Sequence, residues 1–327
     1  MSLISVVVPL KDEEGNVAQL LTRITATLER ATRERGDDYE IVAVDDGSTD
    51  ATLALLRQAQ AGLPRLVIVS LSRNFGHQIA ATAGLENAAG DAVILIDGDL
   101  QDPPELIETF LEKWREGYDV VYATRRARRG ESPFKVQTAR AFYRIIRRLT
   151  NVSIPVDTGD FRLMDRRVVD AIEQTRERHR FLRGLVSWVG FKQTGIEYER
   201  DARVSGKTKY PLSKMVRFAF DGITSFSELP LRFATYLGFI VSAFAFVYTI
   251  VVVILKFLGA NEPGYTSTMV AILFLGGVQL IGIGILGEYV GRIYDQVKGR
   301  PLYFVSSVER SPALASKRPV PGEPVSP

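Results

Sequence analysis

Apolar and charged positions follow two different patterns along the chain, and the change comes near residue 230. Before it, short apolar runs alternate with stretches whose apolar residues recur at helical spacing. The runs that predict strands are 4–8, 40–44, 66–70, 92–96 and 120–123, and the helix-like stretches between them include 16–35, 51–61 and 104–116. This alternation predicts an α/β domain over residues 1–210, with a mostly parallel sheet and helices on both faces.

Two long apolar segments follow this domain. Residues 233–255 and 263–287 contain no charged side chain. At about 1.5 Å per residue, each is long enough to cross a hydrocarbon core of roughly 30 Å. A pair of buried core helices is the alternative, but each run exceeds the usual length of a helix in a soluble protein. We therefore expect two transmembrane helices within residues 231–290.

Basic residues flank the outer ends of these two segments. The cations before the first segment are Lys207, Lys209, Lys214, Arg217 and Arg232, and those after the second are Arg292, Lys298 and Arg300. The connecting loop carries a single Lys and a single Glu. Because cations accumulate on the cytoplasmic side, both termini are expected to be cytoplasmic in an integral protein of the bacterial inner membrane. The N-terminus has no basic region before its apolar residues, so it is interpreted as a strand and not a signal peptide.

The segments beside the apolar runs have their own patterns. Residues 211–230 place apolar side chains near helical spacing with cations among them, which favours an amphipathic helix in the membrane interface. A helix packed on the soluble domain fits the same pattern. Residues 291–327 form a cytoplasmic tail whose Pro-rich end, after Ser311, is expected to be disordered.

Composition narrows the chemistry. The 327 residues carry a formal net charge of +3, which is too weak to indicate a nucleic-acid-binding face. The chain contains no cysteine and only two histidines, His77 and His179. Disulfides, thiolate zinc sites and a cysteine nucleophile are excluded. With two histidines, the chain offers few ways to build a Ser-His-Asp triad or a metal site of several histidines. The chemistry must rest on carboxylates, basic residues and a metal bound by oxygen.

Carboxylates follow two of the predicted strands. Asp45 and Asp46 end one strand, although the following Gly-Ser-Thr is equally typical of a turn with a helix cap. Asp97 and Asp99 end another, and alternate carboxylates repel one another unless a cation or donor lies between them. Since ligands of such sheets bind beyond the carboxyl ends of the strands, these residues predict a site for Mg²⁺ or Mn²⁺ and a substrate diphosphate.

An ordered set of motifs matches a known family. The motifs are Val7-Val8-Pro9, Asp12-Glu13-Glu14, Val44-Asp45-Asp46-Gly47-Ser48, Arg73-Asn74-Phe75-Gly76, Asp97-Gly98-Asp99-Leu100-Gln101-Asp102-Pro103-Pro104, Thr158-Gly159-Asp160-Phe161-Arg162 and the segment 203–210. With them the chain resembles family-2 glycosyltransferases of the GT-A fold. More narrowly, it resembles the polyprenyl-phosphate glycosyltransferases, which include dolichol-phosphate mannose synthase-like enzymes and bactoprenol glucosyltransferases. The resemblance covers the soluble domain and the paired apolar segments.

The resemblance implies roles for individual residues. Those expected at the nucleotide sugar are Pro9, Glu13, Asp46, Asp97 and Arg125, and those expected at the metal are Asp99 and Gln101. Arg203 and Lys209 would bind phosphates of the donor or the lipid. Lys207 joins them by location, although a positive-inside bias alone would explain these cations. Lys11-Asp12 departs from the Tyr-Asn common in the family, which weakens the expectation for contacts to the base.

The resemblance implies transfer of a sugar to a lipid phosphate. This reaction needs no strong general base, because the second pKa of a phosphate monoester is about 6 and the acceptor is largely ionised at neutral pH. Asp157 is the first candidate for orienting the acceptor or removing a proton, and Asp160 is the second; a capping role explains Asp157 equally well. His77 stands where a Lys is frequent in the family and is interpreted as a surface or packing residue.

The expected function is inverting, metal-dependent transfer of a hexose to polyprenyl phosphate, with UDP-glucose as the donor and undecaprenyl phosphate as the acceptor. GDP-mannose or a UDP-aminosugar is an alternative donor. A non-catalytic membrane scaffold or a flippase is the alternative class, and it would not need acidic clusters at two strand ends. Glycines in the second apolar segment permit close helix packing, so a homo-oligomer is plausible.

Overall fold

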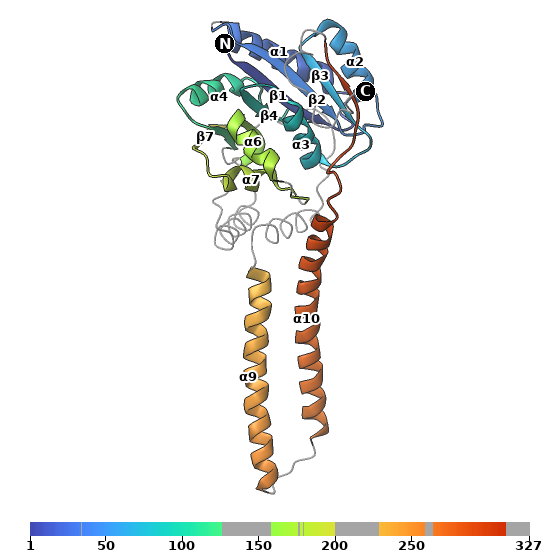
Figure 1. Cartoon of the computed structure of the whole chain (residues 1–327), viewed down its shortest axis with the longest axis vertical. Coiled ribbons are helices and arrows are strands. Elements are labelled where there is room, and N and C mark those ends of the chain that lie inside the picture. The colour runs from blue at the N-terminus through green and yellow to red at the C-terminus, as the bar shows by residue number, and fades with distance from the viewer. Residues whose placement is uncertain are drawn as a thin grey trace. The chain divides into compact units, whose positions relative to one another are not determined.

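The computed structural model describes residues 1–33, 35–125, 158–175, 177–178, 180–199, 229–258 and 264–311 (Figure 1). The chain divides into two compact units. One unit holds the N-terminal domain together with the segment that begins at Pro301, and the other holds the two long helices. Each unit is described by itself.

The first unit is built on a mixed sheet in the order β7-β5-β6-β4-β1-β2-β3-β8. Its strands are β1 (Leu3–Leu10), β2 (Asp38–Asp45), β3 (Leu66–Leu71), β4 (Ala92–Leu95), β5 (Val120–Arg125), β6 (Thr158–Asp165), β7 (Gln193–Tyr198) and β8 (Val305–Glu309). The central pairs β4-β1, β1-β2 and β2-β3 are parallel, as is β5-β7, whereas β6 and β8 pair antiparallel with their neighbours. All five expected strands and the mostly parallel α/β fold are confirmed.

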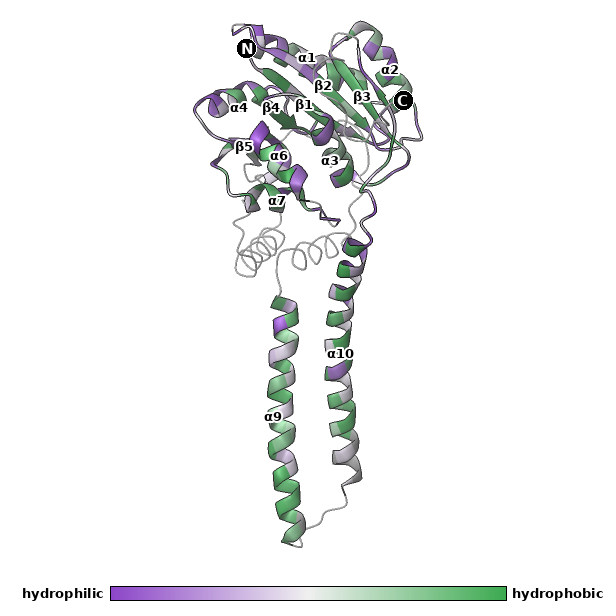
Figure 2. Ribbon diagram, in the orientation of Figure 1, coloured by the Kyte–Doolittle hydropathy of each residue, from purple (hydrophilic) through white to green (hydrophobic). Residues whose placement is uncertain are grey.

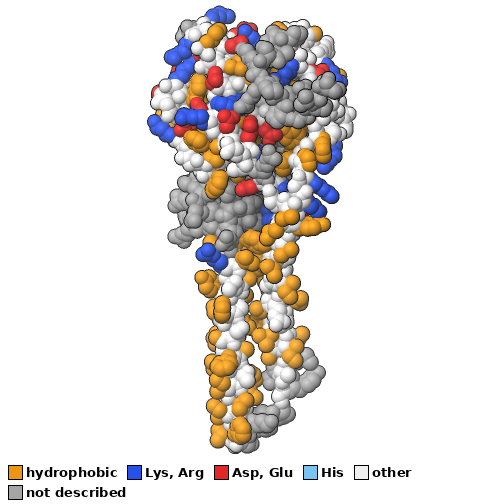
Figure 3. Space-filling model, viewed as in Figure 1, with side chains coloured by type: hydrophobic (Ala, Val, Ile, Leu, Met, Phe, Trp, Pro, Cys, Tyr) orange, Lys and Arg blue, Asp and Glu red, His pale blue; other side chains and the backbone are white. Residues whose placement is uncertain are grey.

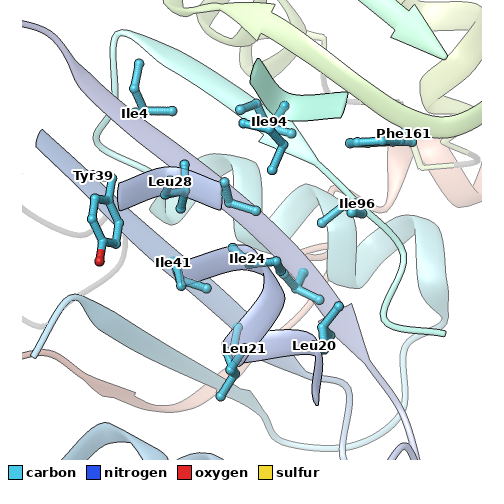
Figure 4. Close-up of a cluster of buried hydrophobic side chains, with 14 of the residues drawn as sticks. Ile4, Leu20, Leu21, Ile24, Leu28, Tyr39, Ile41, Ile94, Ile96 and Phe161 are labelled. Atoms are coloured by element: carbon cyan, nitrogen blue, oxygen red, sulfur yellow. The ribbon is translucent and has the colours of Figure 1, made fainter. Parts of the chain in front are cut away.

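Helix α1 (Val17–Arg33) covers one face of this sheet. Its apolar residues recur every three or four positions, and Leu20, Ile24 and Leu28 are almost fully buried. They pack with apolar side chains of the sheet such as Ile4 and Ile41 (Figure 4). Helices α2 (Thr52–Gly62) and α4 (Leu106–Arg115) contact α1 and the sheet as well. These three helices correspond to the three expected from the sequence.

Helix α3 (His77–Asn87) contacts β1 to β4 and was not singled out from the sequence. Its middle is made of small residues that are all buried, so it has no one-sided apolar stripe. A Cβ at Gly84 would collide with Val7 Cγ1, which means that α3 lies directly against β1. Helices α6 (Arg166–Gln174) and α7 (Leu182–Trp188) follow β6, and α6 contacts α3.

Strand β8 comes from the region that the sequence assigns to the C-terminal tail. It pairs antiparallel with β3, with Ser70 opposite Ser307, and is the outermost strand on that side of the sheet. The guanidinium of Arg57 on α2 contacts the Glu309 carboxylate at 2.7 Å. The chain therefore returns to the N-terminal domain after its two long helices.

The second unit contains α9 (Leu229–Phe257) and α10 (Tyr265–Val297). Residues Leu229–Leu255 and Val270–Val297 are long and apolar enough to cross a membrane, with mean hydropathies of 2.6 and 2.3. Figure 2 shows both helices as largely hydrophobic, and Figure 3 shows apolar side chains along them. Their length and composition agree with the two spans expected from the sequence.

Candidate active site

The carboxyl ends of β1, β2 and β4 meet at one edge of the sheet, because the three strands are parallel neighbours. Leu10 lies opposite Asp45, and the backbone N–H of Asp46 donates to the Leu10 carbonyl at 2.9 Å. Asp97 follows β4, two residues after its end. The sheet therefore brings Pro9, Asp46 and Asp97 to one edge, as strand order in an open α/β sheet requires.

Polar contacts join the loops that follow β1 and β2. Asp12 Oδ1 accepts a hydrogen bond from the Thr49 N–H at 2.8 Å, and Lys11 Nζ donates to the Gly47 carbonyl at 2.6 Å. The bond from Thr49 is the main cause that lowers the pKa of Asp12. The Lys11-Asp12 pair that departs from the family pattern thus fastens these two loops together. The Glu13 N–H donates to Thr52 Oγ1 at 2.9 Å across the same junction.

Asp46 holds the loop that leads into α3. Its two carboxylate oxygens accept hydrogen bonds from the N–H groups of Phe75 and Gly76, at 2.7 and 2.9 Å. Burial raises the pKa of Asp46 despite these bonds. The carboxylate that the sequence assigns to the nucleotide pocket therefore also fixes the position at which α3 begins.

His77, the first residue of α3, lies between two of the predicted carboxylates. Its Nε2 is 3.3 Å from Asp97 Oδ1 and 3.1 Å from Asp160 Oδ2. Ligand atoms of the three side chains all lie within 4.8 Å of one another. The ring of His77 is 41% exposed, as expected of a surface residue, but the fold also gives it two acidic partners that the sequence did not predict. The frequent Lys at this position of the family was the signal for a cation.

Asp160 on β6 accepts from two further side chains. Arg183 Nε on α7 donates to Oδ1 at 2.7 Å, and Gln78 Nε2 donates to Oδ2 at 3.1 Å. Gln78 Oε1 accepts from the Leu182 N–H at 3.0 Å, so this side chain ties Asp160 to the start of α7. The sequence did not single out Gln78 or Arg183, since neither belongs to a motif beside the strand ends.

The charged side chains of this cluster shift one another's pKa values. Burial lowers the pKa of His77, but Asp160 and Asp97 outweigh it and raise that pKa to about 9. Burial raises the pKa of Asp97 to about 6 although the nearby His77 opposes it. Asp160 is buried too, yet Arg183 and His77 hold its pKa well below the ordinary range. At neutral pH the cluster therefore contains a cationic imidazole beside two carboxylates.

Asp99 and Gln101, the predicted metal ligands, lie in the next turn of the same loop. The Gln101 N–H donates to Asp99 Oδ1 at 3.2 Å, and both side chains are partly exposed. Between them Leu100 is buried with φ of 58°, a left-handed conformation that a branched side chain rarely adopts. Such strain is held by the surrounding structure and is common in functional loops.

A divalent cation fits this region by the chemistry of its donors. Carboxylate oxygens and an imidazole converge there, and Asp97 Oδ1 is buried without a hydrogen bond, its ion-pair partner being His77. Carboxylates, amide oxygens and imidazole are ligands that Mn²⁺ accepts, and Mg²⁺ favours the oxygens. The geometry therefore offers Asp97 and Asp160, and His77 once it has lost its proton, as possible ligands in addition to the predicted pair.

Several predicted residues lie where the structure gives no side-chain contacts. Arg125 ends β5, and its side chain is not among the described ones. Residues outside the described ranges are Asp157, Arg203, Lys207 and Lys209, together with the amphipathic segment 211–228. Their expected roles stay predictions.

Comparison with known proteins places both units in described families. Residues 5–173 match the family described as Glycosyl transferase family 2, and residues 229–293 match the GtrB C-terminal hairpin. A solved mannosyltransferase from Pyrobaculum calidifontis, in complex with GDP-Man and Mn²⁺, superposes with a TM-score of 0.45 and 17% sequence identity, over 86% of this chain and 87% of that one.

Curated relatives match over nearly the whole chain. An uncharacterized glycosyltransferase of Synechocystis is 51% identical over 93% of this chain and 95% of its own. The bactoprenol glucosyl transferase of Shigella phage SfII is 44% identical over 94% of this chain and 98% of its own. The prophage bactoprenol glucosyl transferase homolog of Escherichia coli is 42% identical over 94% of this chain and 99% of its own.

Proposed function

The chain belongs to glycosyl transferase family 2 and is a glycosyltransferase, and from this premise we propose that it transfers glucose from UDP-glucose to undecaprenyl phosphate. The observation that carries the proposal is the extent of the relation to bactoprenol glucosyl transferases. The match covers 94% of this chain and 98% of the phage protein, so it extends beyond the N-terminal domain into the paired apolar helices of this chain. A soluble acceptor would not require that second unit, whereas a lipid acceptor remains at the membrane.

The reaction is a single displacement at the anomeric carbon. A phosphate oxygen of the lipid attacks this carbon while its bond to the β-phosphate oxygen of UDP breaks. UDP leaves with the electron pair, so the products are a polyprenyl glucosyl phosphate and UDP. Attack on the face opposite the leaving group inverts the configuration. The lipid phosphate is largely ionised at neutral pH, so no side chain has to act as a strong base.

The described residues supply positions and charges for this reaction. Pro9, Glu13, Asp46 and Asp97 lie in or after strands at one edge of the sheet, which suits the donor nucleotide and sugar. Arg125 is proposed to assist at the donor, and Arg203, Lys207 and Lys209 at the lipid phosphate. Asp160 remains ionised between His77 and Arg183, so its proposed role is to hold these two cations and orient the acceptor. Asp157 is the alternative for that orienting role.

A bound Mg²⁺ or Mn²⁺ would neutralise negative charge on the departing diphosphate. Asp99 and Gln101 are the proposed ligands. His77, Asp97 and Asp160, whose ligand atoms lie within 4.8 Å of one another, are the alternative set once His77 has lost its proton. Preorganised positive charge at a leaving group is one of the largest contributions to catalysis in a site of limited solvent access.

The test is product formation by the full chain in mild detergent. Undecaprenyl phosphate and Mg²⁺ or Mn²⁺ are supplied with UDP-glucose, GDP-mannose or a UDP-aminosugar in separate reactions. Mass spectrometry of the lipid fraction is expected to find a hexosyl phosphate lipid with UDP-glucose, and Asp99→Ala should abolish it while the thermal transition is retained. A product from another donor corrects the sugar. Nucleotide binding without a glycolipid from any donor supports the scaffold or flippase alternative.

A further inference from the structure

The segment 301–311, here called the C-terminal strap, holds the domain at three places. Its strand β8 pairs with β3, and the Ser72 N–H donates to the Phe304 carbonyl at 2.9 Å. Glu309 receives the side chain of Arg57 on α2. The third place is the C-terminal end of α3, where the Tyr303 hydroxyl donates to Glu86 and Arg310 Nη2 donates to the Asn87 carbonyl at 3.0 Å.

The opposite end of α3 lies in the candidate active site. His77 and Gln78 begin the helix, and both contact Asp160 Oδ2 at 3.1 Å. Helix α3 is therefore a short element with one end held by the strap and the other holding a carboxylate of the site. Its 11 residues span only about 16 Å at 1.5 Å per residue.

Such a helix can transmit a displacement along its axis. Its central residues are buried against the sheet, and Gly84 lies in direct contact range of Val7 and Val44. Closely packed interiors transmit strain because they contain little free volume. A shift at Glu86 and Asn87 would then move His77 and Gln78 relative to Asp160, which β6 holds independently.

We propose that Tyr303 and Arg310 of the C-terminal strap are positioning residues, which act through α3 to set His77 and Gln78 against Asp160. The inference rests on the proposed function, since Asp160 belongs to the site assigned there. It adds a role for the residues that follow α10: the chain that leaves the apolar helices closes onto the helix that carries part of the site. Only residues 298–304 separate the end of α10 from β8.

The contacts around Glu86 connect the C-terminal strap to α3 in particular, and not merely to the domain as a whole. Burial and the adjacent Glu86 carboxylate raise the pKa of Tyr303, so its hydroxyl stays protonated and donates. The buried side chain of Arg180 adds a positive charge near Glu86 and donates to Thr82 Oγ1 at 3.4 Å, in the middle of α3. The Arg57–Glu309 pair, by contrast, ties the strap to α2 and does not contact α3.

The experiment uses this difference to separate positioning from stability. Full-length Tyr303→Phe/Arg310→Met loses both strap contacts to α3, whereas Arg57→Met loosens the strap at α2 alone. We expect the double variant to lower kcat by about ten- to a hundredfold, with the KM for UDP-glucose within twofold of wild type, because small misplacements of reacting groups have effects of this size. Arg57→Met should keep kcat within twofold, and Glu86→Gln, which retains an oxygen acceptor, should keep most of it.

Hydrogen exchange gives a readout that does not depend on turnover. Backbone amides of residues 76–82 should exchange faster in the double variant and at the wild-type rate in Arg57→Met. Equal kcat values for the two variants, measured well below both melting transitions, would overturn the proposal, as would unchanged exchange at 76–82 in the double variant. If wild type and Arg57→Met form no glycolipid, the proposed function fails, and the exchange data still decide whether the strap positions α3.

Discussion

At the scale of single residues, His77 changes most between sequence and structure. Alone in the sequence it is an ordinary histidine, but the fold places it 3.1 Å from one buried carboxylate and 3.3 Å from a second. The histidine cation offsets charge that Asp97 and Asp160 would otherwise carry without sufficient compensation. The same side chain is a donor for a metal when it is neutral. Loss of the His77 proton would therefore be required before this side chain could hold a metal ion.

The pairing of His77 with these acids predicts how stability responds to pH. The pKa of His77 is about 9 in the folded chain and about 6.5 in the unfolded chain, so the folded state binds its proton more tightly. Its contribution to stability is therefore complete below pH 6.5 and is lost as the pH rises through 9. Because 41% of the side chain is exposed, solvent screening reduces this contribution to about 1 kcal/mol.

The measurement compares melting of wild type with that of His77→Gln in EDTA. Between pH 7 and pH 9.5, Tm of wild type should fall by about 2–4 °C more than Tm of the variant. Groups that titrate in this range and do not contact His77 are common to both proteins and cancel in the difference. Parallel pH profiles would contradict the assigned ion pairs.

At the scale of elements, α3 connects the core to the site. It lies so close to β1 that position 84 has no room for a side chain, since a Cβ would collide with Val7 Cγ1. The small buried residues around Gly84 make this approach possible. The close packing of the α3 backbone on β1, and not a layer of long side chains, therefore sets the distance between this helix and the sheet.

Gly84→Ala should destabilise the domain by about 1–3 kcal/mol, because the added methyl group overpacks the contact with Val7. Thermal unfolding measures the loss. The matched control is Gly62→Ala at the end of α2, where a Cβ meets no atom within 4 Å. That control should be neutral or slightly stabilising, since it only restricts the unfolded chain. Equal effects of the two substitutions would show that α3 is not tightly packed on β1.

At the scale of the whole molecule, strand β8 constrains how the chain crosses a membrane. It belongs to the same sheet as β1 to β4, although α9 and α10 lie between them in sequence. If both helices span the bilayer, the start of α9 and the end of α10 must lie on the side of the membrane that holds the sheet. The basic residues at their outer ends, Arg232, Arg292 and Lys298, favour the cytoplasm for that side.

Cysteine labelling tests this orientation on a clean background, because the natural chain has no cysteine. Asn261→Cys, between the apolar helices, should react with a membrane-impermeant maleimide on intact spheroplasts. Ala61→Cys, at an exposed position of α2, should react only after permeabilisation. Labelling of Ala61→Cys from outside would contradict the cytoplasmic assignment.

The amino-acid sequence by itself determined the features that depend on local pattern. Short apolar runs located strands β1 to β5, repeats of period 3.6 located helices α1, α2 and α4, and the uncharged runs located both long apolar helices. It also located the carboxylates Asp97 and Asp99, because residues that follow a parallel strand lie at its carboxyl end. These inferences need only neighbouring residues.

Tertiary structure decided which distant residues meet. The middle of helix α3 is buried and has no one-sided stripe to reveal it. Strand β8 pairs with β3 from more than 230 positions away, as in Ser70 opposite Ser307. His77, Gln78 and Arg183 converge on Asp160 because α3, β6 and α7 pack together, and no local repeat encodes that packing. The sequence therefore shows which charged residues the site contains. Which of them pair with one another depends on how whole helices and strands pack, because only that packing brings distant residues into contact.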